Sequence, residues 1–115
     1  MNGSVVQWQF VSSRPEEVAG FYAKAFGWKV TAANGLGYRQ VSAGDGIEGG
    51  IWPAPPGTQG FVQLFLGVAD VEASVARAVT FGAEIVVPVT TLPDGDTMAV
   101  LRDPTGVTFG VMRKR

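Results

Sequence analysis

Few residues of this 115-residue chain suit acid–base, nucleophilic or metal chemistry. The chain has no histidine and no cysteine. Histidine is the commonest general base and the commonest metal ligand, so its absence excludes a Ser-His-Asp triad and any imidazole-bound metal. The absence of cysteine excludes thiolate nucleophiles and disulfides. Carboxylates and side-chain amides are what remain.

One glutamate and three glutamines are the best placed of these groups. Gln7, Gln9 and Gln63 fall within alternating apolar and polar stretches, which are typical of strands. Glu48 precedes a pair of glycines at the end of the first half. A buried carboxylate holds its proton more tightly and can serve as a general base, whereas an exposed one is only a rim charge. Both interpretations of Glu48 remain open.

These groups are positioned by an order of elements that occurs twice. A strand is expected at 5–11, a helix from a capping serine to Gly27, and strands at 28–30, 38–42 and 46–52. The order recurs with a strand at 61–68, a helix from Asp70 to Gly82, and strands at 83–87, 97–102 and 107–111. Each half therefore reads strand–helix–strand–strand–strand.

The repeat predicts one α+β domain over residues 1–115, made of two modules. Module one covers 1–52, a linker rich in proline and glycine covers 53–60, and module two covers 61–115. A half of this size struggles to bury a core alone, so the two modules are expected to pair.

The composition excludes several classes of partner. Hydrophobic residues make up 46% of the chain and the net charge is −1, which argues against disorder and against binding of nucleic acid or an anionic membrane. No signal peptide is evident, and no apolar run approaches the roughly 18 residues of a membrane span. A cytoplasmic protein without a membrane contact is the expectation.

Several motifs carry a family resemblance across nearly the whole chain. They are Phe21-Tyr22 with Phe26-Gly27-Trp28, Gly49-Gly50-Ile51, Val68-Ala69-Asp70-Val71 and Asp103-Pro104-Thr105-Gly106. In these the chain resembles the vicinal oxygen chelate superfamily, which includes glyoxalase I, bleomycin-resistance proteins and extradiol dioxygenases. It is most similar to the group described as predicted enzymes related to lactoylglutathione lyase. The resemblance implies two βαβββ modules forming a cupped, incomplete barrel with the helices outside, and a homodimer.

The resemblance also says where a metal would bind. Metal-dependent members place four ligands on the first and last strands of each module, and those places fall on Gln7, Gly50, Gln63 and Gly110. Glycine has no side chain to ligate with, and neutral amide oxygens are weak partners for a transition metal. We therefore expect no metal and no cofactor, and neither glyoxalase I nor extradiol dioxygenase activity.

Strand alternation predicts which side chains face the interior of the cup. The faces carrying Val6, Trp8, Phe10 and Val62, Leu64, Leu66 are expected to pack against the helices. The opposite faces supply the candidate ligand-binding residues Gln7, Gln9, Trp52, Gln63, Phe65, Thr108 and Met112, with Glu48 the one inward carboxylate. Aromatic surface with a few hydrogen-bonding groups is the usual composition of a small-molecule site. The alternative for Trp52, Phe65 and Met112 is simple core filling.

Three functions remain in view. The leading hypothesis is a metal-free protein that binds a small, partly aromatic organic molecule, with sequestration by bleomycin-resistance proteins as an analogy from fold. The second is a metal-independent lyase or isomerase with Glu48 as general base. The third is a divalent-metal enzyme with atypical ligands.

Overall fold

The computed structural model describes residues 3–114, which form eight strands and two helices. The chain divides into two compact units. The N-terminal unit is Gln7–Gln63, and the C-terminal unit joins residues 64–114 to residues 3–6. Strands β1 (Ser4–Ser12) and β5 (Phe61–Gly67) each contribute residues to both units.

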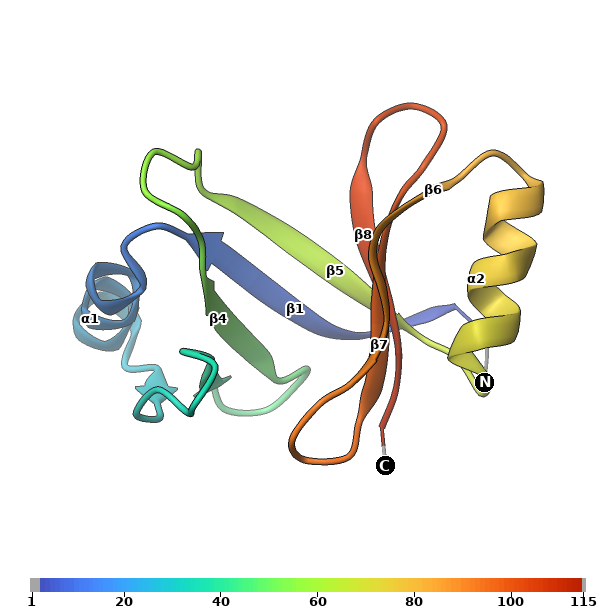
Figure 1. Cartoon of the computed structure of the whole chain (residues 1–115). Coiled ribbons are helices and arrows are strands. Elements are labelled where there is room, and N and C mark those ends of the chain that lie inside the picture. The colour runs from blue at the N-terminus through green and yellow to red at the C-terminus, as the bar shows by residue number, and fades with distance from the viewer. Residues whose placement is uncertain (1–2, 115) are drawn as a thin grey trace. The chain divides into compact units, whose positions relative to one another are not determined.

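The N-terminal unit contains α1 (Pro15–Phe26), β2 (Lys29–Val30), β3 (Arg39–Ser42) and β4 (Gly49–Pro53). Its strands follow the order β2-β3-β4-β1, with β1 parallel to β4 and the other pairs antiparallel. Helix α1 lies beside β4 (Figure 1). The predicted order strand–helix–strand–strand–strand is confirmed here.

The ends of α1 follow from its sequence, with one correction. Pro15 opens the helix, and Gly27 ends it in the left-handed region at φ 74°. The expectation of a serine cap is wrong. Arg14 holds the N-cap position without a side-chain hydrogen bond, and Ser12, still the last residue of β1, accepts from the Arg14 N–H at 3.0 Å.

Aromatic rings join α1 to the strands of its unit. The Phe10 ring lies 5.0 Å from that of Tyr22, which stacks 4.6 Å from Trp28. Trp8 lies 5.1 Å from Trp28. Such ring pairs add about 0.5–1.5 kcal/mol each beyond the burial of their area. The prediction that Trp8 and Phe10 face the helix is therefore confirmed.

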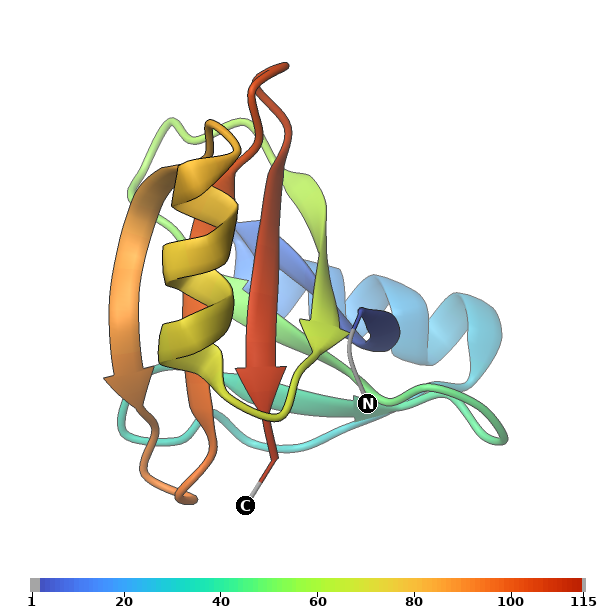
Figure 2. The same ribbon diagram turned by 90° about the vertical axis from the view of Figure 1, so that its right-hand side faces the viewer.

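The C-terminal unit repeats the plan. It contains α2 (Val71–Thr80), β6 (Glu84–Thr91), β7 (Thr97–Arg102) and β8 (Thr108–Arg113), with the strand order β5-β8-β7-β6. Only β5 and β8 run parallel. Helix α2 runs along the strands of this unit (Figure 2). The side chain of Asp70 caps it, as predicted, by accepting from the Ala73 N–H at 3.0 Å.

Two apolar clusters stabilise the C-terminal unit. One joins α2 to the strands and contains Val71, Val75, Ala99, Leu101 and Val111, with Leu66 packed against it. The other contains Phe65, Met98, Val100 and Met112.

Three of the residues expected against helices are placed differently. Val6 packs with the Phe65 cluster instead of a helix. Its Cγ1 lies 2.6 Å from the position that a Cβ added to Gly67 would occupy, so glycine at position 67 leaves room for it. Val62 and Leu64 are 57% and 47% exposed. Leu66 alone of the β5 face packs as predicted.

The composition of the two units confirms the α+β class. Neither helix within residues 3–114 is long and apolar enough to cross a bilayer.

The turn between β7 and β8 is held by a single carboxylate oxygen. Asp103 Oδ1 accepts from the Thr105 hydroxyl at 2.7 Å, the Thr105 N–H at 2.8 Å and the Val107 N–H at 3.0 Å. Gly106, at φ 99°, completes the turn in a conformation that favours glycine. The Thr105 hydroxyl, followed by the Val107 N–H, lowers the pKa of Asp103 below its ordinary value.

The lowered pKa predicts a pH dependence of stability. Because the folded protein prefers the Asp103 carboxylate, this group stabilises the fold above its unfolded pKa, and the contribution is lost as pH falls through the folded pKa. We expect urea unfolding between pH 5 and pH 2 to show a smaller acid-induced loss of stability in Asp103→Ala than in the unaltered protein. Asp45→Ala, at an exposed loop position, is the control. Equal acid sensitivity in the unaltered protein and Asp103→Ala would contradict the prediction.

Candidate functional site

The N-terminal unit presents a polar and aromatic face on the side of its strands opposite α1. Residues paired in register share a face, and Gly50 pairs with Gln9 on β1 and with Gln40 on β3. On the other face, Phe10 pairs with Ile51 and contacts α1 through Tyr22. The row Gln40–Gly50–Gln9 therefore crosses three neighbouring strands on the helix-free face.

Tyr38 is the central residue of this face. Its hydroxyl accepts a hydrogen bond from Gln7 Nε2 at 2.8 Å. Its ring lies 4.8 Å from that of Trp52, at 44°. The hydroxyl edge of the same ring lies against Gly50, and a Cβ added to Gly50 would overlap it. Glycine at position 50 thus permits the ring to lie against the strand.

Gln9 contributes a buried oxygen to the same face. The residue is 4% exposed, and within residues 3–114 its Oε1 has no hydrogen-bond partner. A buried polar atom left unpaired costs about 1–3 kcal/mol. An N–H or O–H donor from a bound molecule would remove that cost.

The candidates in the C-terminal unit are arranged differently. Phe65 is fully buried and pairs in register with Gly110, whose Cα its ring covers. Met112 is also buried and packs with Phe65. Thr108, half-buried, begins β8 opposite Arg102. Phe65 and Met112 therefore have the packing expected of core-filling residues, the alternative that the sequence left open.

The structure groups the predicted site residues by unit. Gln7, Gln9, Trp52 and Gln63 belong to the N-terminal unit, and Gln63 is buried at 6% exposure. Phe65, Thr108 and Met112 belong to the C-terminal unit.

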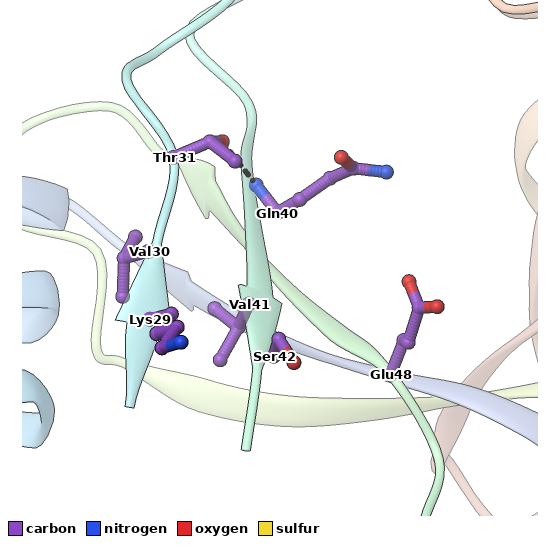
Figure 3. Close-up of a pocket in the computed structure, with 7 residues that line it drawn as sticks. All are labelled: Lys29, Val30, Thr31, Gln40, Val41, Ser42 and Glu48. Atoms are coloured by element: carbon purple, nitrogen blue, oxygen red, sulfur yellow. Dashed lines mark hydrogen bonds between the residues drawn. The ribbon is translucent and has the colours of Figure 1, made fainter. Parts of the chain in front are cut away.

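Glu48 lies at a surface pocket of the N-terminal unit. The residue is exposed, so the burial expected for a general base is not found. Its side chain and that of Gln40 extend toward the same open space (Figure 3). The pocket has a volume of about 210 Å³, and its lining residues are Lys29, Val30, Thr31, Gln40, Val41, Ser42 and Glu48. One cation, one carboxylate, two hydroxyls and an amide thus meet around a small space.

The positions that hold a metal in metal-dependent relatives do not suit one here. Gly50 and Gly110 have no side-chain donor atoms, and aromatic rings occupy the space that a side chain would need. Gln7 Nε2 donates to the Tyr38 hydroxyl, and the oxygen of this neutral amide is a weak ligand for a transition metal. Within residues 3–114, no three Asp or Glu side chains gather in a group that would hold an ion. We therefore derive no chemistry through a metal.

Tyr38 is the site residue that the sequence did not place. It directly precedes β3, in alternation with Gln40, so strand parity puts it on the helix-free face once the register with β4 is known. That register comes from tertiary pairing and not from local pattern.

Gln7 should stabilise this face through its bond to Tyr38. We expect Gln7→Met, which keeps a similar length but cannot donate, to lower the free energy of unfolding by about 1 kcal/mol in urea titration. Gln40→Met is the matched control because the Gln40 side chain is exposed, and it should change stability by less than about 0.5 kcal/mol. Equal effects of both substitutions would show that the Gln7–Tyr38 bond adds nothing.

Comparisons with known proteins agree with this architecture. Residues 7–112 match the family model described as "Glyoxalase-like domain". Two mycobacterial proteins named "Putative glyoxylase CFP32", from Mycobacterium bovis and Mycobacterium tuberculosis, are 28% identical over 96% of this chain. The chain spans 44% of their length.

Solved structures share the fold. Methylmalonyl-CoA epimerase of Streptomyces coelicolor, in complex with 2-nitronate-propionyl-CoA, matches with a TM-score of 0.70 and 17% identity over 99% of both chains. Methylmalonyl-CoA epimerase of Mycobacterium tuberculosis matches with a TM-score of 0.72 and 13% identity, over 98% of this chain and 88% of that one. At this identity the likeness concerns the fold alone.

Proposed function

Because the chain belongs to the glyoxalase-like domain family, within the vicinal oxygen chelate superfamily, we propose that it binds a small, partly aromatic organic molecule without a metal. The observation that carries the proposal is the face formed by Gln7, Gln9, Tyr38 and Trp52. It combines two adjacent aromatic rings with a buried oxygen, that of Gln9, to which no group in the described part of the chain donates.

The chemistry of this face favours a flat ligand that bears a hydrogen-bond donor. Tyr38 and Trp52 are both half-buried, so their rings offer apolar area while remaining partly accessible. Aromatic pairs and few, well-placed polar groups are the usual means of small-molecule recognition. Gln9 Oε1 would accept from the ligand's N–H or O–H group.

Metal independence is supported by the available donors. Two of the four candidate positions are glycines, and the other two, Gln7 and Gln63, carry neutral amides that are weak partners for a transition metal. A divalent-metal enzyme with atypical ligands, the third hypothesis, has no comparable support. Sequestration in the manner of bleomycin-resistance proteins remains an analogy from fold. The homodimer, the cytoplasmic location and the boundaries of the two modules also stay predictions.

A ligand screen tests the leading proposal. We expect a panel of substituted phenols, anilines and aryl amides to yield a binder whose affinity is unchanged by EDTA. Trp52→Ala should weaken it about fivefold, because ring contacts contribute on the order of 1 kcal/mol. Phe26→Ala, which removes a 67% exposed ring from α1, is the control and should leave affinity unchanged. Isothermal titration calorimetry measures all four conditions.

Two outcomes would contradict this proposal. One is a binder that EDTA abolishes, because that would require a metal. The other is equal affinity in Trp52→Ala and the unaltered protein, because the ligand would then bind elsewhere.

An isomerase or lyase with Glu48 as base is the second candidate. Glu48 is exposed, so the support for this candidate is the pocket that Glu48 lines and not burial of its carboxylate. Glu48 shares this space with Lys29, so a substrate bound there would meet both a proton acceptor and a cation. Enzymes named methylmalonyl-CoA epimerase have the same fold.

Proton exchange tests the Glu48 hypothesis. Methylmalonyl-CoA, incubated with the protein in deuterium oxide, should take up deuterium at the carbon between its two carbonyl groups. Glu48→Gln should slow this uptake at least a hundredfold, since an amide cannot accept the proton. Glu72→Gln, at an exposed position on α2, is the control. No uptake above the protein-free rate, or equal uptake in Glu48→Gln, would dismiss Glu48 as a base for this substrate.

A further inference from the structure

Gly50 and Gly110 share a structural feature besides the absence of a ligand side chain: an aromatic ring lies against each of them. Both have φ outside the left-handed region, so the backbone conformation at either position does not itself require glycine. In both cases an added Cβ would overlap an aromatic ring of the same unit, Tyr38 at Gly50 and Phe65 at Gly110. Side-chain packing, and not backbone conformation, therefore requires glycine at these positions.

Several contacts hold the Tyr38 ring in place, among them a bond that its hydroxyl donates to the Gly49 carbonyl oxygen at 3.5 Å. Gln7 Nε2 donates to its hydroxyl at 2.8 Å, and the Trp52 ring lies 4.8 Å away. Gln7 and Gly50 are the two positions of module one that correspond to metal ligands, and the Tyr38 hydroxyl is adjacent to both. One tyrosine thus engages both positions.

The Phe65 ring is held more tightly still. It is fully buried and packs with Met98, Val100 and Met112. Its register partner on β8 is Gly110 itself, so the ring lies across the strand to which its own strand is paired. Moving it would require the whole cluster to repack.

We infer that in each unit an aromatic ring has replaced a metal-ligand side chain, Tyr38 beside Gly50 and Phe65 beside Gly110. The rings determine which residue can occupy each position. A side chain fits at position 50 or 110 only when the ring beside it is removed. Chelation is thereby excluded by occupied space as well as by missing donors. This inference is independent of the proposed ligand, because its test contains none.

A double-mutant cycle at Tyr38 and Gly50 tests the first half. Gly50→Ala alone should lower the folding equilibrium constant at least tenfold, which corresponds to about 1.4 kcal/mol, in urea titration. In a Tyr38→Ala background the same change should lower it less than threefold, because the overlap is gone. Gly20→Ala, in α1 with nothing within 4 Å of an added Cβ, is the control for adding a methyl group. Equal effects of Gly50→Ala in both backgrounds would overturn the inference.

Proton NMR on the unaltered protein covers the case in which a variant fails to fold. Phe65 lies with its ring face over Gly110, so the ring current should shift the Gly110 Hα resonances upfield. Tyr38 meets Gly50 with the hydroxyl edge of its ring, so Tyr38→Ala should change the Gly50 Hα shifts and leave those of Gly110 unchanged. Ordinary Gly110 Hα positions in the unaltered protein, or Gly50 Hα shifts that are the same in Tyr38→Ala, would refute the replacement of ligand side chains by rings.

Discussion

The constraint on which the candidate site depends is the close approach of Tyr38 to the backbone of β4. The ring can lie there only because residue 50 is glycine, and it stays there because Gln7 and Trp52 hold it. Gly49 plays the same part on the opposite face, where the Trp8 ring covers it and extends toward the aromatic cluster at α1. Two consecutive glycines thus let aromatic rings pack against both sides of one strand.

The two units share their order of elements but not the chemistry of their equivalent faces. Gln9 and Phe65 occupy corresponding positions, each two residues after a predicted ligand position and each paired in register with the critical glycine. Phe65 lies in a closed apolar cluster. Gln9 presents a buried oxygen that has no hydrogen-bond partner among residues 3–114, and the rings of Tyr38 and Trp52 on the same face are half-buried. The two units therefore repeat the same order of elements, but the equivalent face is a packed apolar core in the C-terminal unit and a polar and aromatic face in the N-terminal unit.

Most of the fold was predictable from sequence because local signals coincide with the repeat. Pro15, Gly27 and Asp70 mark helix ends as their chemistry requires, and alternation placed Trp8 and Phe10 toward the helix. Alternation failed for Val6, Val62 and Leu64, because what covers a strand face changes along its length. Val6 packs where Gly67 leaves room, a contact between distant segments that no local period encodes.

The candidate site was less accessible to sequence reasoning. Gln7, Gln9 and Trp52 were identified by strand parity, but Tyr38 depends on the pairing of β3 with β4. Glu48 has the strand parity of Gly50, as predicted, yet it is exposed. It lies just before β4 begins at Gly49, beyond the paired part of the strand. Parity gives the direction of a side chain, whereas exposure depends on what tertiary structure places above it.

The burial of Phe65 over Gly110 also limits the substitutions open to this chain. A carboxylate introduced at position 110 alone would overpack the core, and loss of the Phe65 ring alone would leave a cavity. Each single step therefore reduces stability. Because the ring and the glycine depend on each other, neither position can change freely without the other, even though the surrounding scaffold is kept.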